Sequence, residues 1–243
     1  MKILVTGGAG YLGSEVARLA VEAGHDVTAT QFRRPAPFGR AVTIDLRDGF
    51  ETGGADVVIH TAYVQADPDM IVRSARHVAA ASARLIHVST DLVFDGEHAP
   101  YAEDDEPRPV SEYGKAKLKA ERLLPDDALI VRTSLLYGKP GGPQERLAAD
   151  PDAVFHADEI RCPTRVDELA AALLELAGSS TRGVLHIAGP DAVSRLEFAR
   201  LLGASDPKGA PTPPGRARNV ALDSSRAESL LAVPLTGLRR LLQ

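Results

Sequence analysis

The stretch Val5-Thr6-Gly7-Gly8-Ala9-Gly10-Tyr11-Leu12-Gly13 decides the fold of this chain. It connects a short apolar run at residues 3–5 to a segment with helical spacing at residues 11–23. Its glycines follow two spacings, G-x-x-G-x-x-G and G-x-G-x-x-G, which let backbone approach a pyrophosphate at the N-terminus of a helix. The alternative is a strand-helix turn without a ligand, but a place between strand and helix is what the motif requires. We therefore predict cofactor contacts at Gly7, Gly10, Tyr11, Leu12 and Gly13.

The rest of the N-terminal half alternates short apolar runs with helical segments. We expect strands at residues 26–30, 41–44, 57–59, 85–88 and 129–131, and helices at residues 67–83 and 111–124. This alternation is typical of parallel strands that are joined by right-handed crossovers. Because the strands are apolar almost throughout, we expect both faces of the sheet to be covered. The sequence therefore predicts an α/β fold, a doubly wound parallel sheet of the Rossmann type.

The C-terminal part of the chain is less regular. We expect helices at residues 166–178 and 195–202, a strand at 184–187, and loops at 139–143 and 206–218, where proline and glycine gather. Asp223 is a candidate N-cap for a short helix that reaches Leu231. We find no internal repeat and no linker between independent domains. We predict one NAD(P)-binding Rossmann domain over residues 1–243, with a small substrate lobe formed mainly by residues 138–165 and 188–243.

Length and composition narrow the class of protein. The 243 residues suit one medium-sized α/β domain, and 44% hydrophobic with 25% charged residues is an ordinary globular balance. A net charge of −5 offers no basic excess for nucleic acid or anionic lipid. No apolar stretch approaches the roughly 20 residues of a membrane span, and the single cysteine, Cys162, suits a reducing compartment. We expect a cytoplasmic protein that binds neither nucleic acid nor membrane, and a homodimer is compatible with the sequence.

The end of the second expected strand bears on the choice between NAD and NADP. An NAD site usually places Asp or Glu there, to bind the ribose 2′-hydroxyl group. This chain instead reads Thr30-Gln31-Phe32 and then Arg33-Arg34. A guanidinium matches the geometry of a phosphate, and no carboxylate is present to repel one. We predict NADP(H), with its 2′-phosphate on Arg33 or Arg34; the alternative is a pair of solvated loop arginines.

Tyr113 and Lys117 lie one turn apart on the same face of an expected helix. A free phenol has a pKa of about 10, and a nearby ammonium lowers that pKa by stabilising the phenolate. The tyrosine hydroxyl can then protonate a carbonyl oxygen while hydride reaches the carbonyl carbon, and the lysine can also hold the nicotinamide ribose. The alternative is a solvated helix face.

Hydroxyl groups follow the fifth expected strand, in the run His87-Val88-Ser89-Thr90-Asp91. The carboxyl ends of parallel strands line the ligand crevice in this architecture. A hydroxyl at this place can therefore hydrogen-bond the same carbonyl oxygen. The alternative is a Ser/Thr pair that caps a turn, and the glycine turn together with Tyr113 and Lys117, in the required order, favours the functional interpretation.

With these residues in place, the chain resembles an extended short-chain dehydrogenase/reductase, and within that group it is similar to the dTDP-4-dehydrorhamnose reductase family. The STD-x-VFDG and D-x-x-x-x-PT runs are fairly specific to that family, whereas the glycine and YxxxK motifs belong to the whole superfamily. The matching stretches are VTGGAGYLG (5–13), TAYVQAD (61–67), VSTDLVFDG (88–96), YGKAKLKAE (113–121), RTSLLYG (132–138) and DEIRCPTRVDELA (158–170).

The resemblance implies a role for each matching position in catalysis. Thr90, Tyr113 and Lys117 match the catalytic trio, with Tyr113 as the acid and Lys117 as its partner. The resemblance also implies that residues 158–164 lie near the sugar nucleotide and that Tyr137 closes a segment passing the nicotinamide.

The resemblance implies a set of cofactor contacts as well. Asp45 and Leu46 match the pair beside the adenine, and the loop after the fourth strand lies along the cofactor. Tyr113 and Lys117 count as cofactor contacts in addition to their catalytic role. The positions implied beyond the glycine turn and the arginines are Asp45, Leu46, Thr61, Ala62, Tyr63, Ser89, Tyr113 and Lys117.

The chain departs from the family pattern at four places. The family usually has Asn and a small residue at His60-Thr61, and Tyr at Leu92. Its D-Q-x-G-x-P-T run reads D-E-I-R-C-P-T at residues 158–164. The segment between Gly138 and Asp158, which usually helps to form the sugar-nucleotide pocket, is short and rich in Pro, Gly and Ala. The departures fall mainly in the substrate part of the pattern.

Other reactive side chains do not form a convincing site. The seven histidines are scattered without the spacing of metal ligands, so we predict no metal. Cys162 has no matching base in the sequence and is expected to be a buried or pocket-lining thiol. The acidic run at residues 103–106 lies between prolines and is expected to be a solvated loop.

The sequence thus predicts an NADP(H)-dependent oxidoreductase, a reductase that by resemblance acts on the 4-keto group of a nucleotide-linked deoxysugar. Two alternatives stay open at this point: a non-catalytic NADP-binding regulatory subunit, and a reductase of a different small ketone. A nucleotide-sugar epimerase is a further alternative, but such enzymes keep NAD tightly bound, which the arginine-bearing loop does not suit.

Overall fold

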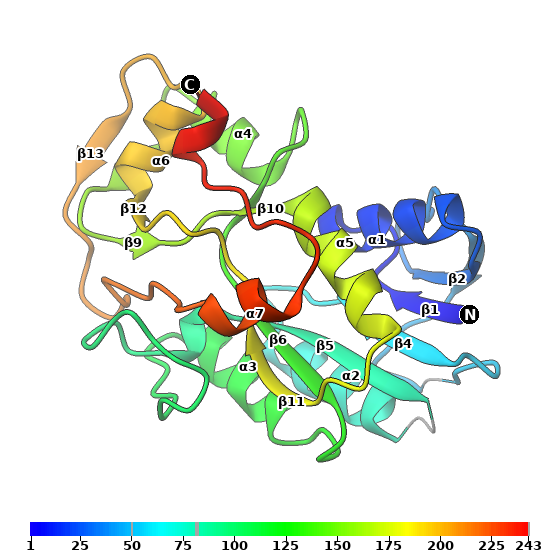
Figure 1. The fold of residues 1–243 in the computed structure, drawn as a ribbon. Coiled ribbons are helices and arrows are strands. Elements are labelled where there is room, and N and C mark those ends of the chain that lie inside the picture. The colour runs from blue at the N-terminus through cyan, green and yellow to red at the C-terminus, as the bar shows by residue number, and fades with distance from the viewer. Residues whose placement is uncertain (50, 81–82, 243) are drawn as a thin grey trace. The chain divides into compact units, whose positions relative to one another are not determined.

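The computed structural model describes residues 1–49, 51–80 and 83–242. Its central feature is a seven-stranded sheet in the order β11-β6-β5-β4-β1-β2-β3 (Figure 1). The sheet is parallel from β5 to β3, with Ile3 of β1 beside Val27 of β2 and Val57 of β4. This confirms the predicted Rossmann-type sheet. The strands are β1 (Lys2–Thr6), β2 (Asp26–Gln31), β3 (Arg40–Thr43), β4 (Val57–His60), β5 (Arg84–Thr90), β6 (Leu129–Thr133) and β11 (Gly183–His186).

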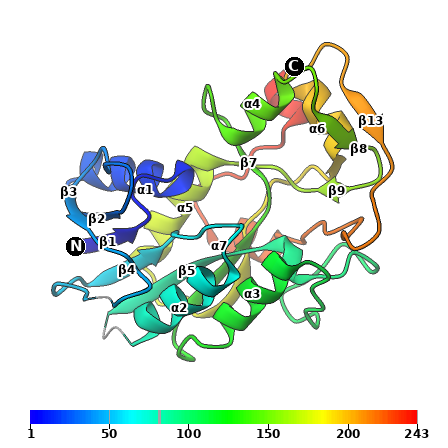
Figure 2. The same ribbon diagram turned by 180° about the vertical axis from the view of Figure 1, so that it is seen from behind.

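The chain divides into two compact units. The first consists of residues 1–89, 115–131 and 170–184, and the second of residues 90–114, 132–169 and 185–243. In the first unit, α1 (Tyr11–Glu22) covers one face of the sheet, and α2 (Pro68–Ala79) covers the other beside α3 (Glu112–Glu121), which enters this unit at residue 115 (Figure 2). The later part of α5 (Val166–Ala177) also belongs to this unit.

Local sequence explains the elements of the first unit. All four residues of β4 are buried, as expected for a parallel strand that is covered on both faces. Helix α2 begins where Asp67 accepts a hydrogen bond from the Met70 backbone and where proline occupies the first turn. One core cluster packs strands β1, β4 and β5 against α2 through Leu4, Val58, Val78, Leu85 and Ala128.

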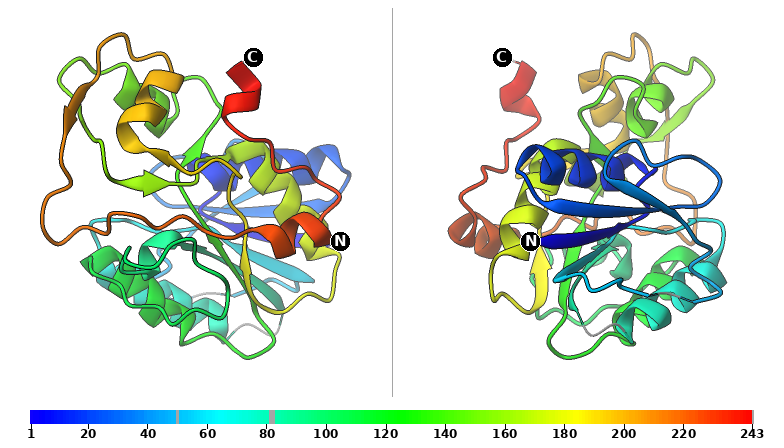
Figure 3. Two further views of the ribbon diagram at one scale, coloured as in Figure 1. Left: turned by 60° about the vertical axis from the view of Figure 1, so that its left-hand side comes forward. Right: turned by 90° about the vertical axis from the view of Figure 1, so that its right-hand side faces the viewer.

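The second unit contains short helices and strands (Figure 3). Small apolar clusters lie among them. Phe198 packs edge-to-face on Tyr137 in one of these clusters. The paired strands are β7 (Leu136–Tyr137) with β10 (Thr164–Arg165), β9 (Ile160–Arg161) with β12 (Val193–Ser194), and β8 (Val154–His156) with β13 (Lys208–Ala210). The helices are η1 (Asp91–Val93), α4 (Pro143–Ala148), α6 (Arg195–Leu201), α7 (Ser225–Leu230) and η2 (Arg239–Leu242).

The expected elements are present, and the differences concentrate in the second unit. The predicted loop at 206–218 contains β13, and α4 follows the turn at 139–143 without having been predicted. The N-cap of α7 is Ser224 rather than Asp223, whose carboxylate instead accepts a hydrogen bond from the Ser225 backbone at 2.9 Å. The helix expected at 67–83 ends at Ala79, and residues 81–82 lie outside the described residues. No helix in the described ranges is long and apolar enough to cross a membrane.

Candidate active site

The glycine turn has the geometry of a phosphate-binding loop. Gly7 has a φ of 73°, and its backbone N–H donates to the Thr30 hydroxyl at 3.0 Å. A Cβ atom on Gly13 would lie 2.2 Å from the Gly7 carbonyl oxygen, so α1 can start this close to β1 only with glycine at that position. A Cβ atom on Gly10 would lie 3.0 Å from the same oxygen. The turn is therefore closely packed and carries no side chain at Gly7, Gly10 or Gly13, at the start of α1.

Replacing Gly13 with alanine is expected to lower the free energy of unfolding by about 1–3 kcal/mol, because the added methyl group forces the turn apart, and to weaken cofactor binding with it. Thermal unfolding with and without NADPH measures both effects. Gly178→Ala is the matched control, since a Cβ atom there meets its neighbour at an ordinary 3.6 Å. Equal stability of the two variants would contradict the tight fit at Gly13.

The loop after β4 is tied to the same turn. The Thr61 hydroxyl donates to the Thr6 carbonyl at 2.7 Å, and the backbone N–H groups of Thr61 and Ala62 approach the Thr6 hydroxyl. A Cβ atom on Gly7 would lie 2.9 Å from the Ala62 Cα atom. The structure therefore brings the predicted residues Thr61 and Ala62 to the glycine turn. Tyr63 follows them with half of its surface exposed.

The segment after β2 presents its side chains to solvent. Phe32, Arg33 and Arg34 are all exposed, and the Arg33 guanidinium lies 5.7 Å from the centre of the Phe32 ring. Gln31 holds the segment in place by accepting a hydrogen bond from the Ala36 backbone at 2.9 Å. Within the described ranges, neither arginine forms an ion pair. Both guanidinium groups are thus available to an anion.

Asp45 and Leu46, the pair predicted beside the adenine, follow β3. The Arg47 guanidinium binds both carboxylate oxygens of Asp45, and these hydrogen bonds lower the pKa of Asp45 to about 2. Leu46 is buried, and its carbonyl oxygen lies 2.8 Å from His77 Nδ1. The Asp45 carboxylate therefore already has a cation as its partner, which the sequence did not indicate.

Helix α3 carries Tyr113 and Lys117 one turn apart, and the lysine is buried with only 3% of its surface exposed. Lys117 Nζ donates to the Val88 carbonyl at 2.6 Å and lies 3.3 Å from His87 Nε2. Burial lowers the pKa of Lys117 to about 8, and the charge of Glu121 opposes that shift. The Lys117 ammonium is therefore held at the carboxyl end of β5, and it loses its proton at a pH only slightly above neutral.

Two buried histidines surround this lysine, and sequence reasoning missed both. The His60 and His87 rings are 5.0 Å apart, and His60 Nδ1 lies 2.7 Å from the Thr6 hydroxyl. Burial lowers the pKa of His60 to about 3 and that of His87 well below its usual range, so both are neutral beside the Lys117 ammonium. The strand position of His87 gave a usable signal, because alternate residues of β5 share one face.

Ser89 shares that face of β5 with His87. Its hydroxyl forms a short hydrogen bond to the Glu121 carboxylate, one turn of α3 beyond Lys117. Ser89 is 4% exposed. Ser89, which the resemblance implies as a cofactor contact, is therefore also an anchor between β5 and α3.

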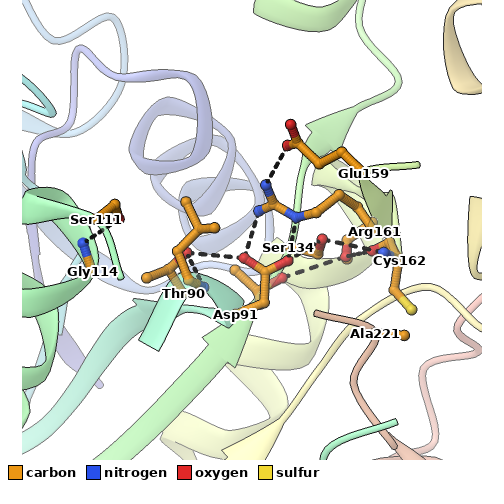
Figure 4. Close-up of polar contacts among 12 residues, drawn as sticks. Thr90, Asp91, Ser111, Gly114, Ser134, Glu159, Arg161, Cys162 and Ala221 are labelled. Carbon is orange, nitrogen blue, oxygen red and sulfur yellow. Dashed lines mark hydrogen bonds and ion pairs between the residues drawn. The ribbon is translucent and has the colours of Figure 1, made fainter. Parts of the chain in front are cut away.

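Thr90 ends β5 and caps η1. Its hydroxyl oxygen accepts a hydrogen bond from the Leu92 backbone at 3.2 Å, and the hydroxyl donates to Asp91 at 3.1 Å (Figure 4). A Cβ atom on Gly114 would lie 2.1 Å from the Leu92 carbonyl oxygen, so glycine lets the first turn of α3 pack against this segment. Tyr113 is the residue before that glycine, in the first turn of α3.

A chain of buried charges continues from Asp91, and the sequence gave no sign of it. Asp91 pairs with Arg161 of β9, and Arg161 also contacts Glu159, all three with 5% or less of their surface exposed (Figure 4). Glu159 accepts further contacts from His156 at 2.9 Å and Arg216 at 3.0 Å. The E-I-R run that departs from the family pattern therefore forms a charged network.

Other predicted residues lie in the second unit. Cys162 is buried, and burial raises the pKa of its thiol to about 11, as expected for an inert cysteine. The Asp158 carboxylate accepts from the backbone and the hydroxyl of Thr212, both at 2.7 Å. Tyr137 is 4% exposed and belongs to an apolar cluster. Among the described residues, no group of three or more His, Cys, Asp or Glu side chains is placed to hold a metal ion.

Comparison with known proteins extends this picture to the whole chain. The dTDP-4-dehydrorhamnose reductase of Mycolicibacterium smegmatis is 33% identical, over 100% of this chain and 84% of the relative. The crystal structure of a hypothetical dTDP-4-dehydrorhamnose reductase from Sulfolobus tokodaii matches with a TM-score of 0.86 and 28% identity, over 97% of both chains. The Bacillus anthracis dTDP-4-dehydrorhamnose reductase in complex with NADP shares the fold, with a TM-score of 0.79, 23% identity and coverage of 99% and 95%. The model of the RmlD substrate binding domain matches residues 1–242, and the chain therefore belongs to that family.

Proposed function

We propose that this protein is an NADP(H)-dependent reductase that acts on the 4-keto group of a nucleotide-linked deoxysugar. The observation that carries the proposal is the buried Lys117 ammonium at the end of β5, one helical turn from Tyr113 on α3. Family membership and the relatives named as dTDP-4-dehydrorhamnose reductases support the choice of substrate class.

The glycine turn and the arginines after β2 fit an NADP molecule. The glycine turn, where a side chain at Gly7 or Gly13 would clash, suits a pyrophosphate at the start of α1. Arg33 and Arg34 stand without an ion pair among the described residues and suit a 2′-phosphate. The NADP in the Bacillus anthracis complex agrees with this assignment. Thr61, Ala62 and Tyr63 would border the cofactor, together with Asp45 and Leu46 on the adenine side.

When it is bound, NADPH supplies the hydride that reduces the carbonyl carbon. Tyr113 gives its phenolic proton to the carbonyl oxygen, and the phenolate then regains a proton from water. Lys117 lowers the pKa of that phenol through its positive charge, and its hydrogen bond to the Val88 carbonyl fixes its position. Thr90 completes the trio at the end of β5.

Replacing Arg33 and Arg34 together with glutamine is expected to raise the Kd for NADPH about tenfold or more, because charge-assisted hydrogen bonds to the phosphate are lost. The Kd for NADH should hardly change, since NADH has no 2′-phosphate. Fluorescence titration with both cofactors measures this. Arg76→Gln, an exposed arginine of α2, is the control. A parallel loss of NADH affinity would count against a 2′-phosphate site.

The short segment before Asp158 supports a second candidate, a non-catalytic NADP-binding regulatory subunit. Only the six-residue helix α4 and strand β8 lie between β7 and Asp158. A reductase of a different small ketone fits the same observation. We also propose a substrate lobe at residues 138–165 and 188–243, a homodimer and a cytoplasmic location.

Consumption of NADPH with dTDP-4-keto-6-deoxyhexoses separates these candidates. The reductase proposal expects turnover and a new nucleotide-linked alcohol by mass spectrometry. Binding of NADPH without turnover of these substrates would favour the regulatory subunit, and turnover of other ketones alone would keep the chemistry but change the substrate.

A further inference from the structure

Arg195, the first residue of α6, is a partly buried cation that no carboxylate neutralises. Its Nη1 atom donates to Gln144 Oε1 of α4 at 2.8 Å, and its backbone N–H donates to the Glu159 carbonyl at 2.9 Å. Within the described ranges, its guanidinium forms no ion pair and no other hydrogen bond to protein. Because an arginine side chain has five N–H donors, most of the hydrogen-bonding capacity of Arg195 is unused.

Strand pairing places Arg195 beside the buried charged network. Strand β12 runs antiparallel to β9, with Val193 beside Arg161. The same register sets Arg195 opposite Glu159, as its backbone hydrogen bond shows. Since alternate residues of paired strands share one face, Glu159, Arg161 and Arg195 belong to one side of this small sheet. Figure 4 shows the contact between Arg161 and Glu159, and all of these residues belong to the second unit.

This cluster contains more guanidinium groups than carboxylates. Arg161 pairs with Asp91 and Glu159, and the exposed Arg216 reaches Glu159 at 3.0 Å. Burial, together with the charges of Arg161 and Arg216, lowers the pKa of Arg195 to about 10, although the charge of Glu159 opposes that shift. Arg195 is therefore still protonated at neutral pH. Its charge is the third positive charge beside two carboxylates that already have partners.

The other carboxylates near Arg195 in the sequence or in the strand pairing are also occupied. Asp158 lies 3.8 Å from the guanidinium of Arg218, and Glu197 of α6 pairs with Arg239 at 2.8 Å. Neither contacts the side chain of Arg195 in the part of the chain that the structure describes. A partly buried cation without a counterion is costly to the fold, which indicates that the counterion of Arg195 is a ligand.

We propose that Arg195 forms an anion-binding site in the second unit that takes a phosphate group, with Arg216 as its second cation. A guanidinium matches the geometry of a phosphate, and a phosphate has enough oxygen atoms to bind both side chains at once. Glu159 keeps Arg161 and His156 as partners when Arg216 turns to the anion. Arg161 itself is not assigned to the ligand, because Asp91 and Glu159 already occupy its guanidinium.

The expected source of the phosphate is the diphosphate of a nucleotide-linked substrate, and this choice of source rests on the proposed reductase function. A free phosphate or pyrophosphate ion would use the same groups. Calorimetric titration of the full chain with dTDP and with inorganic pyrophosphate distinguishes the two sources, because dTDP reports on the nucleotide and pyrophosphate on the anion alone.

Replacing Arg195 with glutamine is expected to raise the Kd for dTDP and for pyrophosphate about tenfold or more, because charge-assisted hydrogen bonds to the phosphate are lost. Arg195→Lys, which keeps the charge, should recover part of the affinity. The Kd for NADPH should hardly change, since the glycine turn belongs to the first unit. Arg200→Gln is the matched control, an exposed arginine on the same helix.

Stability separates a binding site from a structural arginine. Removing Arg195 deprives no carboxylate of an ion-pair partner, so Arg195→Gln should melt near the wild-type temperature, whereas Arg161→Gln leaves the buried Asp91 without its cation and should melt lower. Pyrophosphate should raise the melting temperature of wild type and have little effect on Arg195→Gln, since a ligand stabilises only the protein that binds it.

The titrations decide the proposal. Weaker binding of both dTDP and pyrophosphate by Arg195→Gln would assign the diphosphate of the substrate to this site, and KM should then rise while kcat changes little. Weaker binding of pyrophosphate alone would support the phosphate site with a free anion as its ligand. Wild-type affinity of Arg195→Gln for both would overturn the proposal. If the protein reduces no ketone but binds dTDP through Arg195, the reductase proposal fails and the anion site stands.

Discussion

Replacing Tyr113 with phenylalanine is expected to lower kcat for ketone reduction by about 10²–10⁴-fold while the Kd for NADPH stays near that of wild type. The substitution removes the hydroxyl that protonates the carbonyl oxygen and keeps the ring in place. The fold should tolerate it, because Gly114, not Tyr113, makes the close approach of α3 to Leu92. Steady-state consumption of NADPH and a separate binding titration measure the two quantities.

Tyr63 provides the comparison for this variant. Its ring centre lies 5.9 Å from Lys117 Nζ, so a second phenol is near the same ammonium. Burial of its hydroxyl raises the pKa of Tyr63, which makes it a poorer partner for proton transfer at neutral pH. A loss of turnover in Tyr63→Phe with little change in Tyr113→Phe would move the acid from α3 to the loop after β4.

Replacing Lys117 with methionine is expected to lower kcat by about 100-fold, because the phenol of Tyr113 loses the positive charge that lowers its pKa. The wild-type rate should fall as pH rises above about 8, where the Lys117 ammonium loses its proton. The variant should lack this limb of the pH profile. Lys119→Met, an exposed lysine on the same helix, is the control.

Stability of the same variant tests the burial of the ammonium. Lys117 has a pKa of about 8 in the folded protein, and a lysine in an unfolded chain has a pKa of about 10.4. At pH values between the two, the lysine is protonated less often in the folded protein than in the unfolded chain. The free energy of unfolding of wild type should therefore rise with pH between these values. Lys117→Met should lack this rise, and an identical slope in both proteins would mean that Lys117 is not buried as a titrating group.

The first unit of the fold could be predicted because its signals are local. Apolar runs such as Val57-Val58-Ile59 mark covered strands, and Asp67-Pro68 marks the start of α2. The glycine turn predicts both the strand and the helix that flank it, and it predicts a dinucleotide as the ligand. The second unit gave weaker signals, since strands of two or three residues have no detectable period and β8 pairs with β13 across more than fifty residues.

The residues of the candidate site also fall into two groups, those that local sequence patterns predict and those that only the tertiary structure reveals. The glycine turn, Arg33, Arg34, Tyr113 and Lys117 follow from motifs and spacing. His87 could have been added from strand alternation, because it shares with Ser89 the face of β5 that meets α3. Arg161 could not, because its partner Asp91 stands 70 residues earlier and only tertiary structure brings the two together.

Transfer of deuterium tests the central claim most directly. The purified protein would be given NADPH that carries deuterium at the transferable C4 position, together with a dTDP-4-keto-6-deoxyhexose, and the nucleotide sugar would be examined by mass spectrometry and NMR. The account predicts one deuterium at the former carbonyl carbon of the sugar, with little incorporation by Tyr113→Phe in the same time. Bound cofactor with no deuterium in the sugar would contradict the reductase function.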